Sequence, residues 1–147
     1  MALKVSLKPG EQFIVNGAVI ANGDRRTSLV IQNKVSLLRE RDILQQNEAK
    51  TPAKLVYFAI MMAYLDPDNH QTYYDEFVLR MTEFMNAIEN PTVLTHCVAI
   101  SGDMMARNYY RGLTTCRKLF AYEEELLNYV PGQVSADAND LGVAAAD

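Results

Sequence analysis

The stretch QFIVNGAVIANGDRRTSLVIQ, residues 12–32, decides the fold of the N-terminal part of this chain. Its apolar segments are short, and turn-forming residues interrupt them at Asn16-Gly17 and Asn22-Gly23-Asp24. Asn-Gly suits a two-residue hairpin turn because both positions tolerate positive φ. The sequence therefore predicts that segments 12–15 and 18–21 pair as a β-hairpin.

The neighbouring segments extend this strand pattern in both directions. Residues 3–8 alternate apolar and polar side chains, the two-residue period of a strand with one buried face, before Pro9-Gly10 turns the chain. Further strands are predicted over 27–32 and 35–38, which makes about five strands in an antiparallel meander. Apolar groups occur on both faces of these strands, so the sheet must curl into a barrel, lie under helices or pair with another copy.

Positive charge is concentrated in the first 44 residues, which hold seven basic side chains against four acidic ones. The basic residues are Lys4, Lys8, Arg25, Arg26, Lys34, Arg39 and Arg41. The segment carries about +3 in a protein of net charge −4, so the remainder is near −7. A cationic β unit joined to an acidic body predicts that the first part meets an anion.

Helical signals dominate the chain after residue 50. Thr51-Pro52 combines an N-cap with proline at the first helical position and predicts a helix to about Leu65. Apolar residues between 73 and 88 recur at spacings of three and four, typical of a second helix. Asn90-Pro91 opens a third helix that ends near 101–102, and Asp103 is expected to cap a fourth. The predicted fold class is α+β, with a small N-terminal antiparallel β unit packed on a C-terminal bundle of about four helices.

The expected organisation is a basic β unit over 1–45, a helical bundle over 46–130 and a flexible tail over 131–147. The content of 49% hydrophobic and 22% charged residues excludes the disordered class. The longest apolar run, 55–65, has 11 residues, whereas a membrane span needs about 20, so it predicts a central buried helix. We expect a cytoplasmic protein without membrane association, because the N-terminus alternates and carries no signal-peptide pattern.

The sequence shows no convincing catalytic or metal-binding constellation. His96 and Cys97 are neighbours on a helix and point about 100° apart, so they do not face each other as base and nucleophile. Zinc requires three or four ligands, and His96, Cys97 and Cys116 are nearly the whole supply. No phosphate-binding glycine loop is present. We therefore predict no enzyme, no catalytic residue, no metal and no cofactor, with both cysteines as buried apolar groups.

Two charged clusters on the last helix leave alternatives open. The acids at 123–125 lie near a helix C-terminus, where the macrodipole disfavours them, so a positive group should be close. They form a solvated acidic face or contact the cationic β unit. Arg107, Arg111 and Lys118 share a helix face that touches phosphate or is simply solvated.

Nucleic-acid binding by the β unit must depend on charge rather than stacking. Phe13 is its one aromatic residue, whereas sheets that bind single-stranded RNA by stacking display several. Arginine and lysine contacts to phosphates and base edges would have to replace stacking on aromatic side chains. The proposed RNA-binding residues are Arg39, Arg26, Arg25 and Arg41, with Lys4 and Lys8 as peripheral donors. The alternative is a solvated basic surface.

Several segments resemble the FlbT family of bacterial flagellum biosynthesis repressors. They are LKPGE (7–11), NGAVIANGDRR (16–26), LLRERDIL (37–44), TPAK (51–54) and RKLFAYEEELL (117–127). The resemblance runs in order from Leu3 to Leu127. It implies a post-transcriptional regulator that binds the 5′ untranslated region of flagellin mRNA and lowers its translation or lifetime. It also implies a small flagellar partner protein, FlaF, although some members affect flagellin positively.

The opening of the chain is also similar to the carbon storage regulator CsrA, a five-stranded β protein that binds mRNA leaders. The similarity rests on Leu3, Lys8, Gly10, Glu11, Ile14 or Val15, and Asn16-Gly17. Arg39-Glu40 resembles the pair after that family's last strand, whose arginine touches RNA, and this places Arg39 first among the candidates. The chain departs from the pattern at Leu7, where that family often has an RNA-contacting arginine, and at Arg41, an additional residue before Ile43.

The expected function is thus post-transcriptional regulation of flagellin synthesis through mRNA binding. The alternative is a protein-binding adaptor whose apolar helical grooves hold FlaF or flagellin, with an indirect effect on RNA. Homo-oligomerisation is a further expectation, because the two-sided β unit needs a cover that a second copy or the helices would supply.

Overall fold

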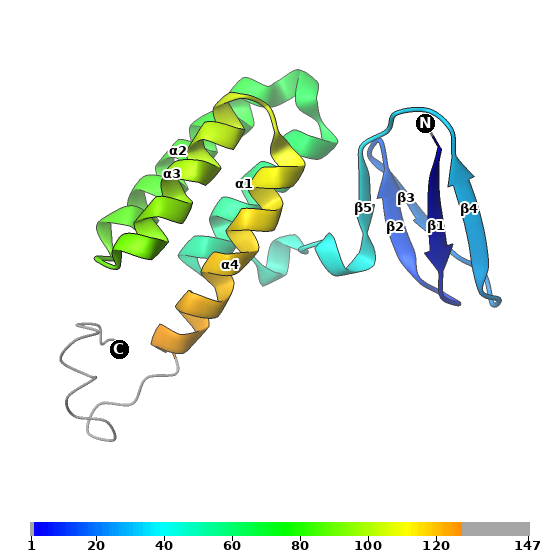
Figure 1. Cartoon of the computed structure of the whole chain (residues 1–147), viewed down its shortest axis with the longest axis horizontal. Coiled ribbons are helices and arrows are strands. Elements are labelled where there is room, and N and C mark those ends of the chain that lie inside the picture. The colour runs from blue at the N-terminus through cyan, green and yellow to red at the C-terminus, as the bar shows by residue number, and fades with distance from the viewer. Residues whose placement is uncertain (1, 128–147) are drawn as a thin grey trace.

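The computed structural model describes residues 2–127, and within them strands come first and helices follow (Figure 1). The strands are β1 (Leu3–Leu7), β2 (Gln12–Val15), β3 (Ala18–Ala21), β4 (Thr27–Ile31) and β5 (Leu37–Arg39). The helices are α1 (Pro52–Leu65), α2 (His70–Asn86), α3 (Pro91–Met105) and α4 (Tyr109–Leu127). The α+β prediction is confirmed, and the predicted flexible tail over 131–147 lies outside the described residues.

The predicted hairpin is present with its predicted bounds. Asn16 and Gly17 adopt φ values of 50° and 87°, the positive values of the tight turn that joins β2 to β3. Phe13 pairs with Ile20, and Ile14 pairs with Val19. The Asn-Gly dipeptide therefore sets both the turn and the register of these two strands.

The five strands do not form the predicted meander. β1 pairs with β4 in one antiparallel sheet, while β3, β2 and β5 form a second sheet in that order. The two sheets lie face to face around Val5, Leu7 and Phe13, each about 2% exposed. A flat meander would leave one of these apolar faces in water, so folding the strands into two layers is favoured.

The sheet of β2 and β5 is apolar on both sides because the helices cover its second face. Ile14 and Leu38 point away from β1 and belong to the same buried cluster as the helical core. The strands thus lie under the helices. This is one of the three arrangements that the apolar pattern of the strands allowed, the others being a barrel and pairing with another copy. Strand β3 stays at the edge, with all four residues exposed.

The predicted helix starts at 51–52 and 90–91 are confirmed by their caps. Thr51 Oγ1 accepts a hydrogen bond from the Lys54 N–H at 3.3 Å, and Pro52 occupies the first helical position. Asn90 Oδ1 accepts from the Thr92 N–H at 2.9 Å. Both caps satisfy donors that the first turn of a helix leaves unpaired.

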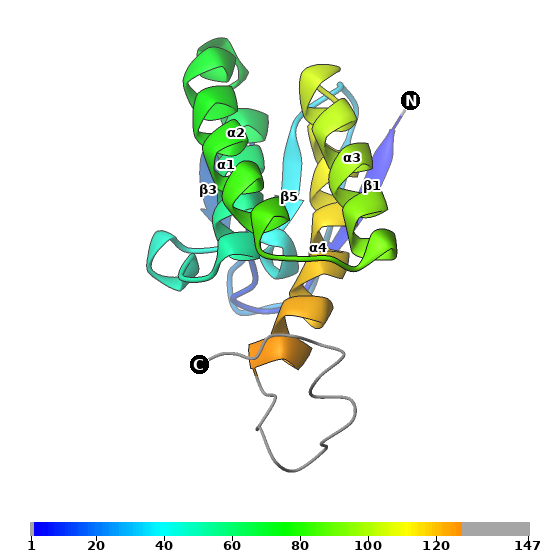
Figure 2. The ribbon, with the colours of Figure 1, turned by 90° about the vertical axis from the view of Figure 1, so that its left-hand side faces the viewer.

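Helix α1 lies at the centre of the helical part. It packs against α2 and α4, and α4 packs in turn against α3. Figures 1 and 2 show α1 and α4 nearest the strands and α2 and α3 in the outer layer. Val56 and Ile60 of α1 are fully buried, as are Cys97 and Cys116, which confirms the predicted central helix and the buried cysteines.

The prediction that Asp103 caps the last helix is wrong. Helix α3 continues through Asp103 to Met105, and the break comes at Arg107, whose φ is 63°. Asp103 is buried and binds Arg111 of α4 at 2.7 Å. Its carboxylate therefore holds the α3–α4 turn closed rather than starting a helix.

The acidic run at 123–125 does not contact the β unit through its buried member, Glu123. The Glu123 carboxylate accepts a hydrogen bond from the Ala53 N–H at 2.9 Å, at the N-terminus of α1. The positive group that the sequence required is the N-terminal end of that helix, where the macrodipole favours negative charge. Glu124 and Glu125 are exposed.

A short segment after β5 connects the strands to the helices. It contains η1 (Glu40–Asp42) and η2 (Gln46–Glu48); a third such turn, η3 (Pro67–Asn69), precedes α2. Asp42 is buried, and its carboxylate accepts a hydrogen bond from Arg117 of α4 at 2.7 Å. Among the helices of residues 2–127, none is both long and apolar enough to cross a membrane.

Candidate nucleic-acid interface

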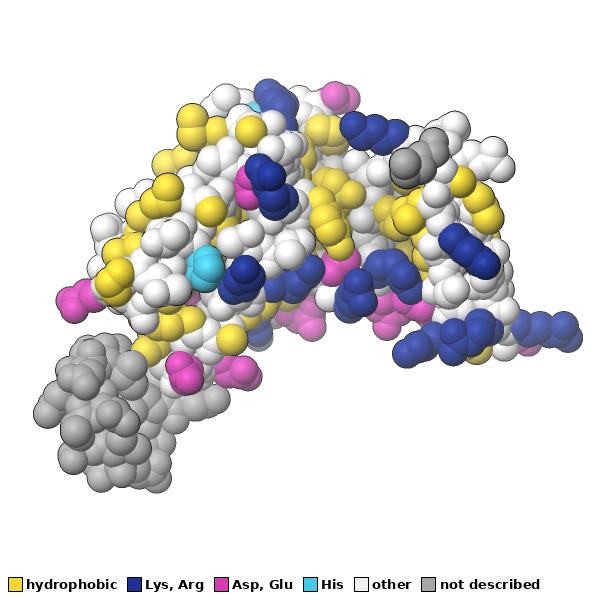
Figure 3. Space-filling model, viewed as in Figure 1, with side chains coloured by type: hydrophobic (Ala, Val, Ile, Leu, Met, Phe, Trp, Pro, Cys, Tyr) yellow, Lys and Arg dark blue, Asp and Glu magenta, His cyan; other side chains and the backbone are white. Residues whose placement is uncertain are grey.

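A cavity of about 660 Å³ opens at the end of the β unit where β1 and β5 both finish. Four basic side chains line it, Lys8, Arg26, Arg39 and Arg41, together with the carboxylates of Glu11 and Glu40. Figure 3 shows Lys and Arg side chains gathered along this end of the strands, with acidic side chains among them. The lining carries a net positive charge of two, which favours an anionic ligand.

The turn after β1 shapes one wall of the cavity. The Glu11 N–H donates to the Lys8 carbonyl at 3.0 Å, and Gly10 adopts a φ of 74°. Proline followed by glycine with positive φ forms a type II turn. The turn brings Lys8 beside the residues that follow β5.

Asn22 fixes a second loop against this turn. Its amide nitrogen donates to the Lys8 and Arg25 carbonyls, each at 2.8 Å. The Gly10 N–H donates to the Gly23 carbonyl at 2.9 Å. These bonds hold the loop that carries Arg26 next to the Lys8 turn, so the β1–β2 and β3–β4 connections share one cavity.

Arg39 lies on the inner face of its sheet and touches the other sheet. Its guanidinium donates to the Ser6 carbonyl at 2.7 Å and binds Glu11 at 3.4 Å. About a third of the side chain is exposed. Arg39 therefore connects the two sheets, and only part of it faces the cavity.

Two exposed arginines, Arg26 and Arg41, line the cavity, and Lys8 is exposed beside them. The Arg41 side chain is 79% exposed, and its Nε lies 3.9 Å from the buried Asp42 carboxylate. Arg117 is nearer to that carboxylate, at 2.7 Å. Arg41 and Arg26 are consequently the side chains best placed to change partner when an anion binds.

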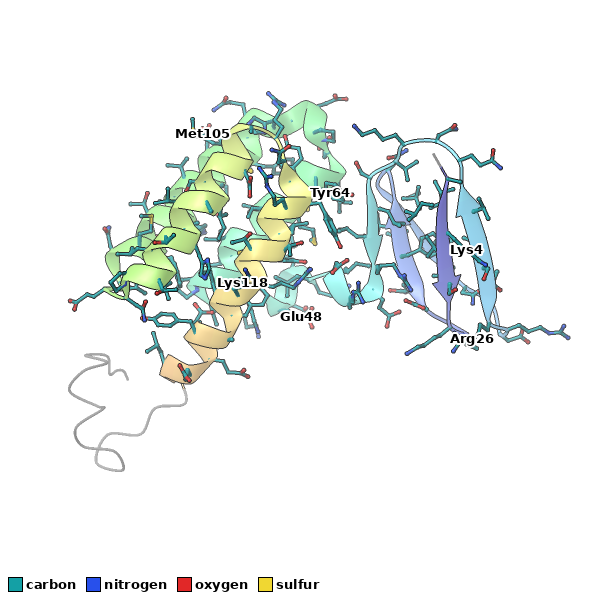
Figure 4. All side chains as sticks on the ribbon, in the orientation of Figure 1. Lys4, Arg26, Glu48, Tyr64, Met105 and Lys118 are labelled. Atoms are coloured by element: carbon teal, nitrogen blue, oxygen red, sulfur yellow. The ribbon has the colours of Figure 1, made fainter. Side chains whose placement is uncertain are left out.

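Arg25 and Lys4 are candidate residues that the structure does not bring to the cavity. The Arg25 carbonyl accepts from Asn22 and Thr27, but its side chain is not among the lining groups. Lys4 pairs with Val30 on the outward face of the β1–β4 sheet. Figure 4 shows Lys4 on that face and Arg26 at the end of the strands.

The two carboxylates of the cavity have structural partners of their own. Glu11 accepts from the Lys8 N–H at 2.8 Å, and this bond, with Arg39 nearby, lowers the pKa of Glu11. Glu40 accepts from the Gln12 N–H at 2.7 Å. Both acids come from the β unit and its following turn, so the cations are not covered by carboxylates of the helices.

The structural roles of Glu11, Glu40 and Asn22 did not emerge from the charge count. Glu11 and Asn22 bind the backbone of Lys8, and Glu40, which lies between Arg39 and Arg41 in the sequence, binds the Gln12 N–H. Asparagine before glycine is a signal for side-chain bonding in turns, and it was available in the sequence. The acids gave no such signal for their long-range partners, because Glu11 meets Arg39 and Glu40 meets Gln12 only after the strands have paired.

The chain matches the family described as "Flagellar protein FlbT" over residues 3–127. It is 54% identical over 136 residues to the "Flagellum biosynthesis repressor protein FlbT" of Caulobacter vibrioides, covering 92% of this chain and 96% of that protein. A "Probable flagellum biosynthesis repressor protein FlbT" of Caulobacter sp. strain K31 is 56% identical over 130 residues, covering 88% of this chain and 99% of that protein.

A more distant relative carries a similar name. The "Probable flagellum biosynthesis repressor protein FlbT 1" of Bradyrhizobium diazoefficiens is 40% identical over 149 residues, covering 99% of this chain and 100% of that protein. No solved structure matches the chain significantly. The family match spans every strand and helix described above. This chain belongs to the FlbT family of flagellar proteins.

Proposed function

We propose that this protein regulates flagellin synthesis after transcription by binding the 5′ untranslated region of flagellin mRNA and lowering its translation or lifetime. The cationic cavity at the end of the β unit carries the RNA part of the proposal. The regulatory part is supported by relatives named as repressors of flagellum biosynthesis. The chain itself performs no chemistry in this proposal.

Binding in this proposal is electrostatic and directional. Arg26 and Arg41 contact phosphates, and Lys8 adds charge at the rim. Arg39 orients the site through Ser6 and offers its exposed part to the RNA. Contacts of this kind position a strand, and base edges supply sequence preference.

The test compares two double variants that each remove two positive charges from the β unit. Arg26→Ala/Arg41→Ala acts inside the cavity, and Lys4→Ala/Arg25→Ala acts outside it. The measurement is a salt-titrated binding assay with a flagellin leader RNA. We expect the first variant to bind about tenfold more weakly and its logarithmic salt slope to fall by roughly 1.4, for two contacts at about 0.7 each.

The outside variant serves as the matched control for net charge. It is expected to retain most of the affinity, because its residues lie away from the cavity. If both variants lose RNA affinity equally, RNA binding depends only on the overall charge of the protein. Unchanged binding by a folded Arg26→Ala/Arg41→Ala variant would reject the cavity as the RNA site.

A second candidate function is a protein-binding adaptor for FlaF or flagellin. Its motivation is a set of exposed apolar side chains on the outer helices, Val78, Leu79, Val98 and Met105, between 43% and 67% exposed. Figure 3 shows hydrophobic side chains gathered over α2 and α3, and Met105 is labelled near the end of α3 in Figure 4. Exposed apolar patches are typical of protein contact sites.

Purified components separate the two functions. If the protein binds purified FlaF and has no measurable affinity for the leader RNA, the adaptor function is favoured. Salt-sensitive RNA binding in the absence of any partner favours direct regulation. A Val98→Ser/Met105→Ser variant that no longer binds FlaF but still binds RNA would show that the apolar surface and the cationic cavity bind their partners independently.

A further inference from the structure

A second cavity, of about 410 Å³, lies where the β unit meets the helices. Lys34 and Ser36 line it from the segment before β5. Tyr64 at the end of α1 and the turn that leads into α4 line it from the other side. Figure 4 shows Tyr64 directed from α1 toward the strands.

The charged groups of this cavity are all positive. Lys34, Arg107 and Arg111 line it, and its lining contains no carboxylate, in contrast to the first cavity. Asp103, which does not line the cavity, binds Arg111 at 2.7 Å, yet the Arg111 side chain remains 70% exposed. The cavity therefore presents cations to any ligand that enters it.

The backbone at Arg107 is held in an unusual conformation. Its φ of 63° lies in the left-handed region, which costs free energy for a residue with a side chain. The Asn108 N–H donates to the Asp103 carbonyl at 2.8 Å and stabilises the turn. With the bond from the Arg107 N–H to the Met104 carbonyl at 3.2 Å, this is the common closing motif of a helix, and it places the Arg107 side chain at the cavity.

Two of the three tyrosines that line the cavity, Tyr64 and Tyr110, offer ring surfaces rather than hydroxyl groups, whereas Tyr109 is buried in the core behind them. The Tyr64 hydroxyl is bound to the backbone of Leu37, with 2.9 Å to its N–H. The hydroxyl of Tyr109 lies 2.6 Å from His70 Nδ1, and that of Tyr110 donates to Asp42 at 3.4 Å. Their hydrogen bonds point away and fix the rings, which reduces the entropy lost when a planar group stacks on them.

We infer that this cavity binds one nucleotide unit, with its base against the rings of Tyr64 and Tyr110 and its phosphate on Lys34, Arg107 and Arg111. Base stacking on an aromatic ring and phosphate contact with a cation are the two parts of single-strand recognition. Asn108 and Ser36 provide polar groups for a base edge. The one aromatic residue of the β unit, Phe13, is buried, and the helices supply partly exposed rings here.

The nucleotide has two possible sources, a free mononucleotide or one residue of an RNA strand, and the second rests on the proposed function. Ser36 precedes β5 and Arg39 ends it, so the two cavities lie at opposite ends of this strand. Three residue steps of about 3.3 Å put these Cα atoms roughly 10 Å apart. An RNA leader is long enough to reach both cavities along β5.

The first experiment measures binding of a labelled flagellin leader RNA to the full chain with the double variant Lys34→Gln/Arg107→Asn. Asparagine tolerates the left-handed conformation, so the backbone of the turn is preserved. Lys50→Gln/Lys118→Gln removes the same charge from exposed positions outside both cavities. We expect about tenfold weaker binding for the cavity variant only, with a salt slope lower by roughly 1.4.

The second experiment detects a free nucleotide without RNA. The chain has two histidines, and His70 contacts Tyr109 of the cavity whereas His96 lies on α3. On titration with AMP, the imidazole proton resonance of His70 should shift while that of His96 stays. A His96→Gln variant assigns the two signals, and Lys34→Gln/Arg107→Asn should abolish the shift.

The outcomes separate this inference from the proposed function. Weaker RNA binding by the cavity variant supports the strand as the source, and an AMP shift without an RNA effect supports the free nucleotide. If neither is seen, the inference is overturned, even where Arg26→Ala/Arg41→Ala weakens RNA binding. If the parent protein binds no RNA, the proposed function fails and the AMP titration alone decides the inference.

Discussion

Arg39 shows how one residue can serve both the fold and a binding surface. Its resemblance to an arginine of the carbon storage regulator CsrA makes Arg39 a candidate RNA contact, yet its guanidinium spans the two sheets to reach Ser6. Its Nε is buried without a hydrogen-bond partner among the described residues, which adds a cost to its burial. Exposed Arg41 has no comparable structural bond, so the two arginines respond differently to substitution.

Replacing Arg39 by alanine should reduce the free energy of unfolding by about 1 kcal/mol, because the bond to the Ser6 carbonyl is lost. Urea denaturation of the two proteins measures the difference. Arg41→Ala is the matched control and is expected to stay within about 0.5 kcal/mol of the parent. An unchanged midpoint for Arg39→Ala would mean that the sheets do not depend on this contact.

His70 makes stability depend on pH near neutrality. Burial lowers its pKa from the ordinary 6.5, and the charge of Arg107 lowers it further. The unfolded chain therefore binds the proton first as pH falls, so the contribution of His70 is present above about pH 6.5 and lost below it. We expect the free energy of unfolding to decline between about pH 7.5 and 5.5.

Urea unfolding across this pH range checks the expectation in three proteins. His70→Gln should flatten the decline, because glutamine does not titrate, while His96→Gln should leave it in place. The same pH dependence in His70→Gln as in the parent would assign the effect to another group.

At the level of single elements, residues of other elements help to stabilise the starts of two helices. Helix α1 begins with its own Thr51 cap, and it also receives the Glu123 carboxylate from α4, 70 residues away. Helix α4 begins after a turn that Asp103 closes by binding Arg111. Each helix end is thus stabilised by a residue of another element as well as by its own sequence.

Glu123→Ala should lower the free energy of unfolding by about 1–2 kcal/mol, because the Ala53 N–H loses its acceptor at a helix N-terminus. Thermal and urea unfolding measure this loss. Glu124→Ala removes a neighbouring exposed acid and should change stability by less than about 0.5 kcal/mol. Similar small effects for both variants would contradict the capping role of Glu123.

Across the whole molecule, a few polar groups determine how the β unit sits on the helices. Asp42, three residues after β5, accepts from Arg117, and the Tyr57 hydroxyl donates to its carbonyl at 2.6 Å. Burial raises the pKa of Tyr57 to about 12, so this hydroxyl keeps its proton. Tyr64 binds the backbone of β5 at Leu37. Of these residues, Tyr64 also lines the second cavity.

Asp42→Asn should cost about 2–3 kcal/mol of stability, because Arg117 loses a buried carboxylate while remaining one-third exposed to water. A double-mutant cycle with Arg117→Gln should give a coupling free energy of about 1–2 kcal/mol. Asp24→Asn, an exposed acid of the β unit, is the control. Additive effects of the two substitutions would show that the pair does not connect the parts.

Local signals allowed the hairpin, two helix starts and the α+β order to be predicted. Asn16-Gly17, Thr51-Pro52 and Asn90-Pro91 act within a few residues of chain, where backbone preferences dominate. The excess of positive charge in the first 44 residues is also a property of the sequence alone. Of the six predicted site residues, Lys8, Arg26, Arg39 and Arg41 do meet at one cavity.

Tertiary structure alone decided that β1 pairs with β4 and β2 with β5, what Glu123 binds, and where Lys34 meets the tyrosines. Each of these contacts joins residues far apart in the chain. Such contacts form only when many weak packing contributions together offset the entropy of closing long loops. The total of these contributions cannot be deduced from any short segment of sequence. The sequence by itself determined the elements and their charge, and packing determined which of them became neighbours.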